Sequence, residues 1–220
     1  MIIVPFICLG AVCLIMSIVY TILNNKKGWQ GLLVKCLTML SLFVFAMISA
    51  NLMSLINAIA LYIPISFVVL IISECLDCME VDLKSKTIFQ GIINIIAFAL
   101  IAMSAMSLAE FNVLSLAGGI LLGAGIGLIS WAVNKYKDFY IIILEIFNFI
   151  AICAIIGLGI NAVLLSTHLI SSILLLAGGV VLLIQKMMRV FDNRHKAVNL
   201  IANELYILAL IAVGCSLFFF

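Results

Sequence analysis

The sequence predicts an all-α membrane protein, a polytopic bundle of eight transmembrane helices in a single domain. The chain of 220 residues is 67% hydrophobic and only 9% charged, whereas soluble domains are roughly 45–50% apolar and about 25% charged. Apolar runs of about 20 residues recur at short intervals, and this is the length that a helix needs to cross a bilayer. The composition therefore leaves no room for a soluble domain.

The eight predicted spans are apolar runs joined by connections of roughly five to ten residues, so successive helices are expected to be antiparallel neighbours in one compact bundle. The runs lack the ten-residue alternation of barrel strands, which favours helices. Together they organise residues 1–220 as one domain. In chain order, the spans cover residues 2–22, 31–50, 55–77, 87–108, 112–133, 139–160, 168–190 and 198–219.

Local features support particular spans. The first begins at MIIVPFICLG, which has neither a basic segment nor a small-residue cleavage site, so we expect a retained helix rather than a signal peptide. The third ends on the stretch LIISECLDCMEVD, where an apolar run meets carboxylates. The fifth contains Gly119, Gly123 and Gly127 at four-residue spacing, a pattern typical of a close helix-packing seam.

Basic residues mark one face of the predicted bundle. Every Lys and Arg lies in or beside an odd-numbered connection, and the even-numbered connections and both termini have none. Because Lys and Arg concentrate in cytoplasmic loops, the odd connections are predicted to be cytoplasmic and both termini non-cytoplasmic. The basic residues are Lys26, Lys27, Lys35, Lys84, Lys86, Lys135, Lys137, Lys186, Arg189, Arg194 and Lys196.

Polar residues inside the spans gather within roughly 5–15 Å of the cytoplasmic boundary, at 1.5 Å of helix per residue. On each helix they recur at i,i+3 or i,i+4 and so form one stripe. Ionised groups in a bilayer cost a few kcal/mol each, so we expect the stripes to face a shared cavity open to the cytoplasmic leaflet. This polar layer comprises Lys35, Glu74, Asp77, Gln90, Asn94, Glu145, Asn148, Gln185, Lys186, Asn199, Asn203, Glu204 and Tyr206.

Simpler interpretations exist for several of these residues. Lys35, Lys186 and Arg189 lie close enough to the interface to snorkel. The carboxylates that close the third span could be solvated end charges. Glu145 and Glu204 lie deeper, and a structural ion pair with a lysine is the main alternative for them.

Glu74 and Asp77 lie one helical turn apart. Two such carboxylates cannot both ionise freely at low dielectric, so one should keep its proton unless a lysine neutralises the pair. An acid and a base then coexist and can activate a water without a metal or a covalent nucleophile. The same pair would serve a proton-coupled carrier.

Cys75 and Cys78 form a C-x-x-C motif. We interpret these two cysteines as packing residues, because the chain has only two histidines to complete a metal site. No metal, cofactor or nucleic-acid partner is predicted.

Several motifs occur in a recognisable order. GWQGLLVKCLTMLSLFVF opens the second span, an acidic residue closes the third, FQGIINIIAF follows in the fourth, LAGGVVLLIQK in the seventh, and DNRHKAVNLIANELY leads into the eighth. Over nearly its whole length the chain resembles the YhhN family of membrane proteins, which contains the lysoplasmalogenases. Lys35, Gly91, Gly178 and Tyr206 stand at positions typical of that family, whereas Cys36 replaces its proline.

The resemblance implies hydrolysis of the vinyl ether bond of lysoplasmalogens in a cell membrane, with a membrane lipid or lysolipid as partner. Asp77 and Glu74 would supply the acid and base. Lys35 and Lys186 would bind phosphate or hold a carboxylate ionised, and the water and headgroup would be oriented by Asn94, Glu145, Glu204 and Tyr206. The alternatives are a small permease or proton-linked lipid carrier, or a catalytically silent lipid-binding relative. A polar layer on one side only favours the enzyme or its inactive descendant, since a carrier needs polar steps on both sides.

Overall fold

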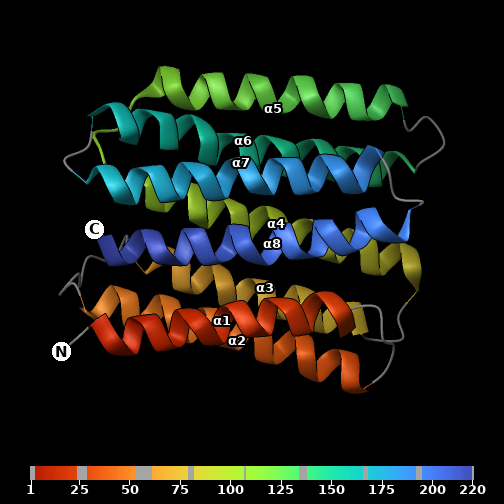
Figure 1. The fold of residues 1–220 in the computed structure, drawn as a ribbon. Coiled ribbons are helices and arrows are strands. Elements are labelled where there is room, and N and C mark those ends of the chain that lie inside the picture. The colour runs from red at the N-terminus through yellow and green to blue at the C-terminus, as the bar shows by residue number, and fades with distance from the viewer. Residues whose placement is uncertain are drawn as a thin grey trace.

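The computed structural model describes residues 3–23, 29–52, 61–78, 82–106, 108–133, 138–165, 168–191 and 195–219. Within these ranges the chain forms eight α-helices and a short 3₁₀ turn, and no strand. The helices lie side by side with their axes roughly parallel (Figure 1). They are α1 (Ile3–Leu23), α2 (Trp29–Leu52), α3 (Tyr62–Cys78), α4 (Leu83–Ala105), α5 (Val113–Val133), α6 (Phe139–Leu165), α7 (Leu169–Phe191) and α8 (Lys196–Ser216), followed by η1 (Leu217–Phe219).

Six helices, α2 and α4 to α8, are long and apolar enough to cross a membrane. The other two, α1 and α3, contain shorter apolar segments at Ile7–Leu23 and Tyr62–Leu76. The predicted all-helical, multi-pass membrane bundle is confirmed at this level. The predicted third span began at residue 55, and residues 53–60 lie outside the described part of the chain.

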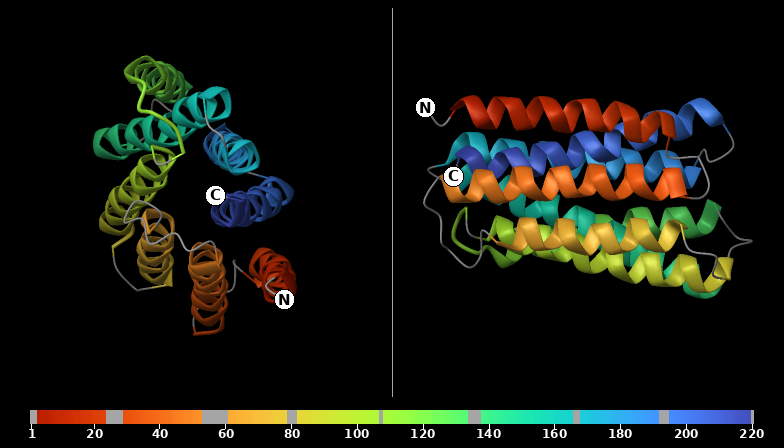
Figure 2. Two further views of the ribbon diagram at one scale, coloured as in Figure 1. Left: turned by 90° about the vertical axis from the view of Figure 1, so that its left-hand side faces the viewer. Right: turned by 90° about the horizontal axis from the view of Figure 1, so that it is seen from below.

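Seven helices form a ring in which α1, α2, α3, α4, α6, α7 and α8 each pack on the next, and α8 closes against α1. Figure 2 shows this arrangement along the helix axes, with α5 standing outside the ring against α6. The expectation that all successive helices are neighbours is therefore wrong at one step, because α4 packs on α6 instead of on α5.

Glycines explain the position of α5. Gly119, Gly123 and Gly127 are buried on one face of this helix, and a Cβ added at Gly123 would lie 2.5 Å from the Cα of Ile150 on α6. Only a residue without a side chain allows the two backbones to approach this closely. The predicted packing seam is confirmed. On its other side, α6 packs on α4, where a Cβ added at Gly91 would lie 3.1 Å from the Cδ1 of the Leu144 side chain.

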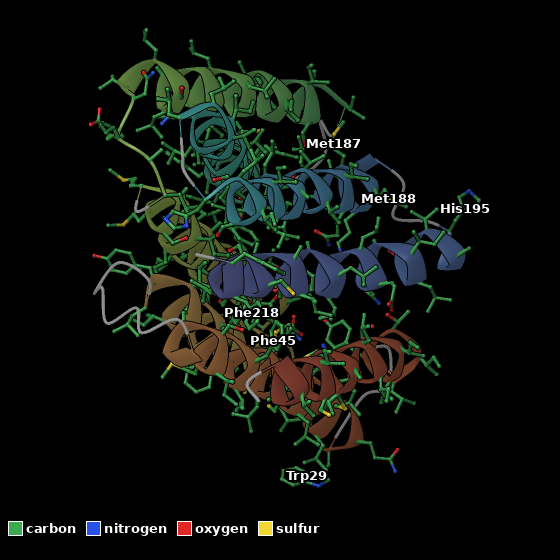
Figure 3. The ribbon with its side chains drawn as sticks, turned by 60° about the vertical axis from the view of Figure 1, so that its left-hand side comes forward. Trp29, Phe45, Met187, Met188, His195 and Phe218 are labelled. Carbon is green, nitrogen blue, oxygen red and sulfur yellow. The ribbon has the colours of Figure 1, made fainter. Side chains whose placement is uncertain are left out.

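Aromatic and aliphatic side chains fill most of the ring. Tyr20, Phe45, Phe67 and Phe149 are fully buried. Phe45 lies between α2 and α8, where it contacts the backbone at Gly214, whereas Trp29 projects from the outer side of α2 (Figure 3). The core is therefore continuous from α1 to α8, and any polar site must lie towards one end of it.

The two ends of the bundle differ in charge. α1 begins and α8 ends at the same end (Figure 1). The helices α2, α4, α6 and α8 begin at the opposite end. We call it the basic end, because the described Lys and Arg side chains lie on the helical turns nearest to it. There Lys84 forms an exposed ion pair with Asp138, with Nζ 2.7 Å from Oδ2. Hydrogen bonds from Lys84 and from the backbone N–H of Tyr140 hold the pKa of Asp138 below its usual value.

Candidate functional site

Two neighbouring cavities lie inside the ring towards the basic end. The first has a volume of about 140 Å³ and is walled by α1, α2, α3, α4 and α7. The second has a volume of about 190 Å³ and lies between α4, α6 and α7. They share Gln90, Asn94 and Arg189 as walls. Polar groups from helices far apart in the sequence thus meet in one region.

An ion pair forms one wall of the first cavity. The Nζ of Lys35 lies 3.6 Å from the Oε2 of Glu74, and the hydroxyl of Tyr20 donates a hydrogen bond of 3.1 Å to Oε1 of the same carboxylate. The side chains of Lys35 and Glu74 are only 4% and 15% exposed. Each oxygen of Glu74 therefore has a partner that favours an ionised carboxylate.

The antiparallel packing of α2 and α3 brings this pair together. Lys35 lies in the second turn of α2, and Glu74 lies one turn before the end of α3, so both fall at the same depth below the basic end. Lys35 is buried, and its snorkelling interpretation is wrong. The solvated-end-charge interpretation of Glu74 is also wrong, because its side chain lies in the cavity wall.

Amide groups connect α3 to α4 across the same cavity. The hydroxyl of Ser73 donates a hydrogen bond of 2.9 Å to the Oδ1 of Asn94, and the Nε2 of Gln90 donates one of 3.2 Å to the carbonyl of Ser73. Gln90 and Asn94 line both cavities. The predicted stripe on α4 therefore faces the inside of the ring.

Charged side chains from two helices line the second cavity. Glu145 of α6 and Lys186 of α7 are both in its walls. Asn148, one turn after Glu145, is 2% exposed and donates through Nδ2 to the carbonyls of Leu144 and Gly91 at 2.9 and 3.4 Å. Within the described ranges, its Oδ1 has no hydrogen-bond partner. The second cavity therefore combines a carboxylate, an ammonium and amide groups.

Arg189 connects the two cavities with α8. It donates a hydrogen bond of 2.7 Å to the Oδ1 of Asn203, and its guanidinium lies 5.9 Å from the ring centre of Tyr206, which is buried. Arg189 is exposed, as its snorkelling interpretation expects, and it also lines both cavities. Its spacing of three residues from Lys186 was the available signal that both face the same side of α7.

Glu204 has a different position from the one expected of a cavity residue. Its two carboxylate oxygens accept hydrogen bonds of 2.8 Å from Ser17 and 2.6 Å from Thr21, both on α1. The residues lining the two cavities do not include Glu204. It joins α8 to α1 where the ring closes, through hydroxyl groups, and no lysine among the described side chains forms an ion pair with it.

The predicted site residues are thus partly assembled. Lys35, Glu74, Asn94, Glu145 and Lys186 line the two cavities, Tyr206 supports Arg189, and Glu204 joins α1 to α8. Asp77 belongs to α3 by its backbone, but its side chain lies outside the described residues. The first cavity is also lined by Tyr20, Ser73 and Arg189, which were not predicted to face it, and by Gln90, which was predicted as part of the polar layer.

The cavities contain an ion-paired carboxylate, two further cationic groups and several amides. This set can bind an anionic headgroup, accept a proton from water and orient that water. A cluster of three or more His, Cys, Asp or Glu side chains that could hold a metal ion does not occur among the residues that the structure describes. Comparisons of the chain with protein-family models, with curated proteins and with solved structures found no match.

Proposed function

We propose that this protein is a YhhN-like membrane hydrolase that cleaves the vinyl ether bond of lysoplasmalogen-type lysolipids. The observation that carries the proposal is Glu74 in the wall of a cavity inside the ring, with Lys35 at 3.6 Å and the Tyr20 hydroxyl at 3.1 Å. A half-buried carboxylate with two such partners is held in the ionised form, in which it can take a proton from water.

The proposal includes a topology. All eight helices cross the cell membrane, both termini are non-cytoplasmic, and the basic end is cytoplasmic. The 21 residues of α1 extend over about 31 Å, enough for the hydrocarbon core, and the shorter α3 lies between α2 and α4 in the ring. The two cavities then lie near the headgroup level of the inner leaflet, where a single-chain lipid can place its polar end.

Hydrolysis of a vinyl ether begins with a proton added to the carbon farther from the ether oxygen. The resulting oxocarbenium carbon is attacked by water, and the hemiacetal breaks into a fatty aldehyde and a glycerophospho-alcohol. In our proposal Asp77 supplies the proton to carbon, and Glu74 takes a proton from the attacking water and returns it to the leaving alcohol. As the hemiacetal breaks, its hydroxyl proton passes to the Asp77 carboxylate, so both residues regain their starting states. Lys35 keeps Glu74 ionised before the water is activated.

The remaining cavity residues serve the headgroup. Lys186 and Arg189 can pair with the phosphate, since a guanidinium matches phosphate oxygens and an ammonium adds a point charge. Tyr206 holds Arg189 in place from α8. Asn94 and Glu145 orient the water and the polar end of the substrate from α4 and α6.

The placement of the polar cavities supports a hydrolase over a permease or proton-linked lipid carrier. In the half opposite the basic end, the cavity of about 260 Å³ between α5 and α6 is lined by small and apolar residues, among them Gly118, Leu122 and Ile156. A carrier needs polar steps on both sides of the membrane midplane. At the end opposite the basic end, the cavity beside Ser104, Ser171 and Ser216 has only about 10 Å³, which is at the lower limit for a single water.

The test is aldehyde release from a lysoplasmalogen by the purified protein. Glu74→Gln should lower the rate by about 10²–10⁴-fold, the usual contribution of a general base, and Asp77→Asn should abolish release. Asp138→Asn, which removes an exposed carboxylate at the same end, is the matched control and should retain the wild-type rate. Full activity of Glu74→Gln would refute the assignment. Lipid binding without aldehyde release would identify a catalytically silent relative.

A further inference from the structure

Two cysteines lie in contact beside the ion pair. The sulfur atoms of Cys36 on α2 and Cys75 on α3 are 3.3 Å apart, a distance at which either thiol can donate to the other. Both cysteines are half-buried thiols that are not joined in a disulfide. Cys36 directly follows Lys35, and Cys75 directly follows Glu74. The thiol contact and the ion pair therefore join the same two helices at the same depth.

The thiols are already close to the geometry of a disulfide. A disulfide needs sulfurs about 2.05 Å apart, so the two atoms must approach by only about 1.3 Å, which small rotations of two cysteine side chains supply. Packing alone does not require two cysteines here, because any pair of small apolar residues fills such a position. What distinguishes two thiols in contact is that oxidation can join them.

We propose that Cys36 and Cys75 are a modification site: mild oxidation joins them in a reversible disulfide that ties α2 to α3 beside the Lys35–Glu74 ion pair. The oxidant is a peroxide and the reductant is a dithiol. At a cytoplasmic basic end, the reducing surroundings keep the resting pair as free thiols, and the disulfide forms only when peroxide rises.

The chemistry balances with hydrogen peroxide as the co-reactant. One thiolate attacks a peroxide oxygen, so the O–O bond breaks, a sulfenic acid forms and one water leaves. The second thiol then attacks the sulfenic sulfur, forming the S–S bond and releasing a second water. The two sulfurs together lose two electrons and two protons, and the peroxide is reduced to two waters. A dithiol reverses the step by exchange and becomes a disulfide itself.

The disulfide should change the neighbouring ion pair. Because Lys35 and Glu74 are the residues adjacent to the two cysteines, drawing the sulfurs together moves the Nζ and Oε2 atoms that now lie 3.6 Å apart. A misplacement of about 1 Å can cost a catalytic group about 10²-fold in rate. This consequence, unlike the disulfide itself, rests on the proposed function, and it makes the oxidised protein the less active form.

The test begins with the wild-type protein in detergent. It is treated with hydrogen peroxide, its remaining thiols are blocked with a maleimide, and the digested peptides are identified by mass spectrometry. We expect one linked pair of peptides that contains Cys36 and Cys75, is lighter by two hydrogens and disappears after dithiothreitol. Cys36→Ser and Cys75→Ser should each abolish the linked pair. Cys8→Ser, which removes an exposed thiol on α1, should leave it unchanged.

Three results would overturn the proposal: a link between Cys75 and Cys78, a link between two molecules, or full maleimide labelling of both thiols after peroxide.

A second readout is thermal unfolding, in which oxidation should raise the Tm of the wild type but not that of Cys36→Ser. Aldehyde release should fall about 10²-fold on oxidation and return with dithiothreitol. Because the mapping needs no substrate, the two proposals can fail separately. A wild type that forms the link on oxidation but releases no aldehyde even when reduced would refute the proposed function alone, and a wild type that releases aldehyde but does not form the link would refute this inference alone.

Discussion

The ion pair between Lys35 and Glu74 should be strongly coupled in stability. Two unit charges 3.6 Å apart attract by about 4.6 kcal/mol at an effective dielectric constant of about 20. Desolvation of two nearly buried groups offsets more than half of this, which leaves a net coupling of about 2 kcal/mol. Lys35→Met and Glu74→Gln should each cost about 3 kcal/mol, because each leaves the other charge buried without this partner. The double variant should cost about 4 kcal/mol instead of the additive 6 kcal/mol.

The measurement is equilibrium unfolding in mixed detergent micelles, with helix content followed by circular dichroism for the wild type, both single variants and the double variant. The pair Lys84 and Asp138 is the matched control, since its side chains are 55% and 32% exposed. A cycle of Lys84→Met and Asp138→Asn should show a coupling far smaller than that of Lys35→Met and Glu74→Gln, because solvent screens an exposed pair. If the effects of Lys35→Met and Glu74→Gln simply add, the two groups are separately solvated and our account of the first cavity is wrong.

Two further predictions concern packing and pH. Gly123→Ala should lower the free energy of unfolding by about 1–3 kcal/mol, because the new Cβ would meet the backbone at Ile150. At Gly125 a new Cβ has open space, and Gly125→Ala should not lower the free energy of unfolding, since Ala suits a helix interior better than Gly. The lowered pKa of Asp138 means that its pairing with Lys84 stabilises the protein above the usual carboxyl pKa of 3.8 and is lost as pH falls through the lower folded value. The measurement is the Tm of the wild type and of Asp138→Asn from pH 6 to about pH 2. The wild-type Tm should decline on the acid side as the pairing is lost, and the Tm of Asp138→Asn should lack this decline. Identical profiles of the two proteins would contradict a stabilising role for this pairing.

The sequence predicted those parts of the structure that depend on periodicity and composition. Apolar runs located the helices, because a backbone in lipid must satisfy its hydrogen bonds within the segment. The i,i+4 spacing of Gln90 and Asn94 correctly predicted a stripe that faces the ring. The glycines of α5 correctly indicated a close helix contact, since a missing side chain is visible in the sequence itself.

Helix neighbours could not be predicted in the same way. A short connection brings two helices near each other, but side-chain shape decides which surfaces pack. α4 and α5 are consecutive, yet the glycine face of α5 fits α6, and α6 also packs on α4. For the same reason Tyr20 and Ser73 were missing from the predicted site. Each is an ordinary residue of an apolar span until α1, α3 and α4 bring it against Glu74 or Asn94.

The closure of the ring through Glu204, Ser17 and Thr21 constrains the order of assembly. Of the eight helices, α1 is made first and its partner α8 is made last. Until α8 arrives, the hydroxyls of Ser17 and Thr21 lack the Glu204 carboxylate, and Arg189 in the wall of the first cavity lacks Asn203. The ring and the full set of contacts around the first cavity can therefore form only after all eight helices have been made.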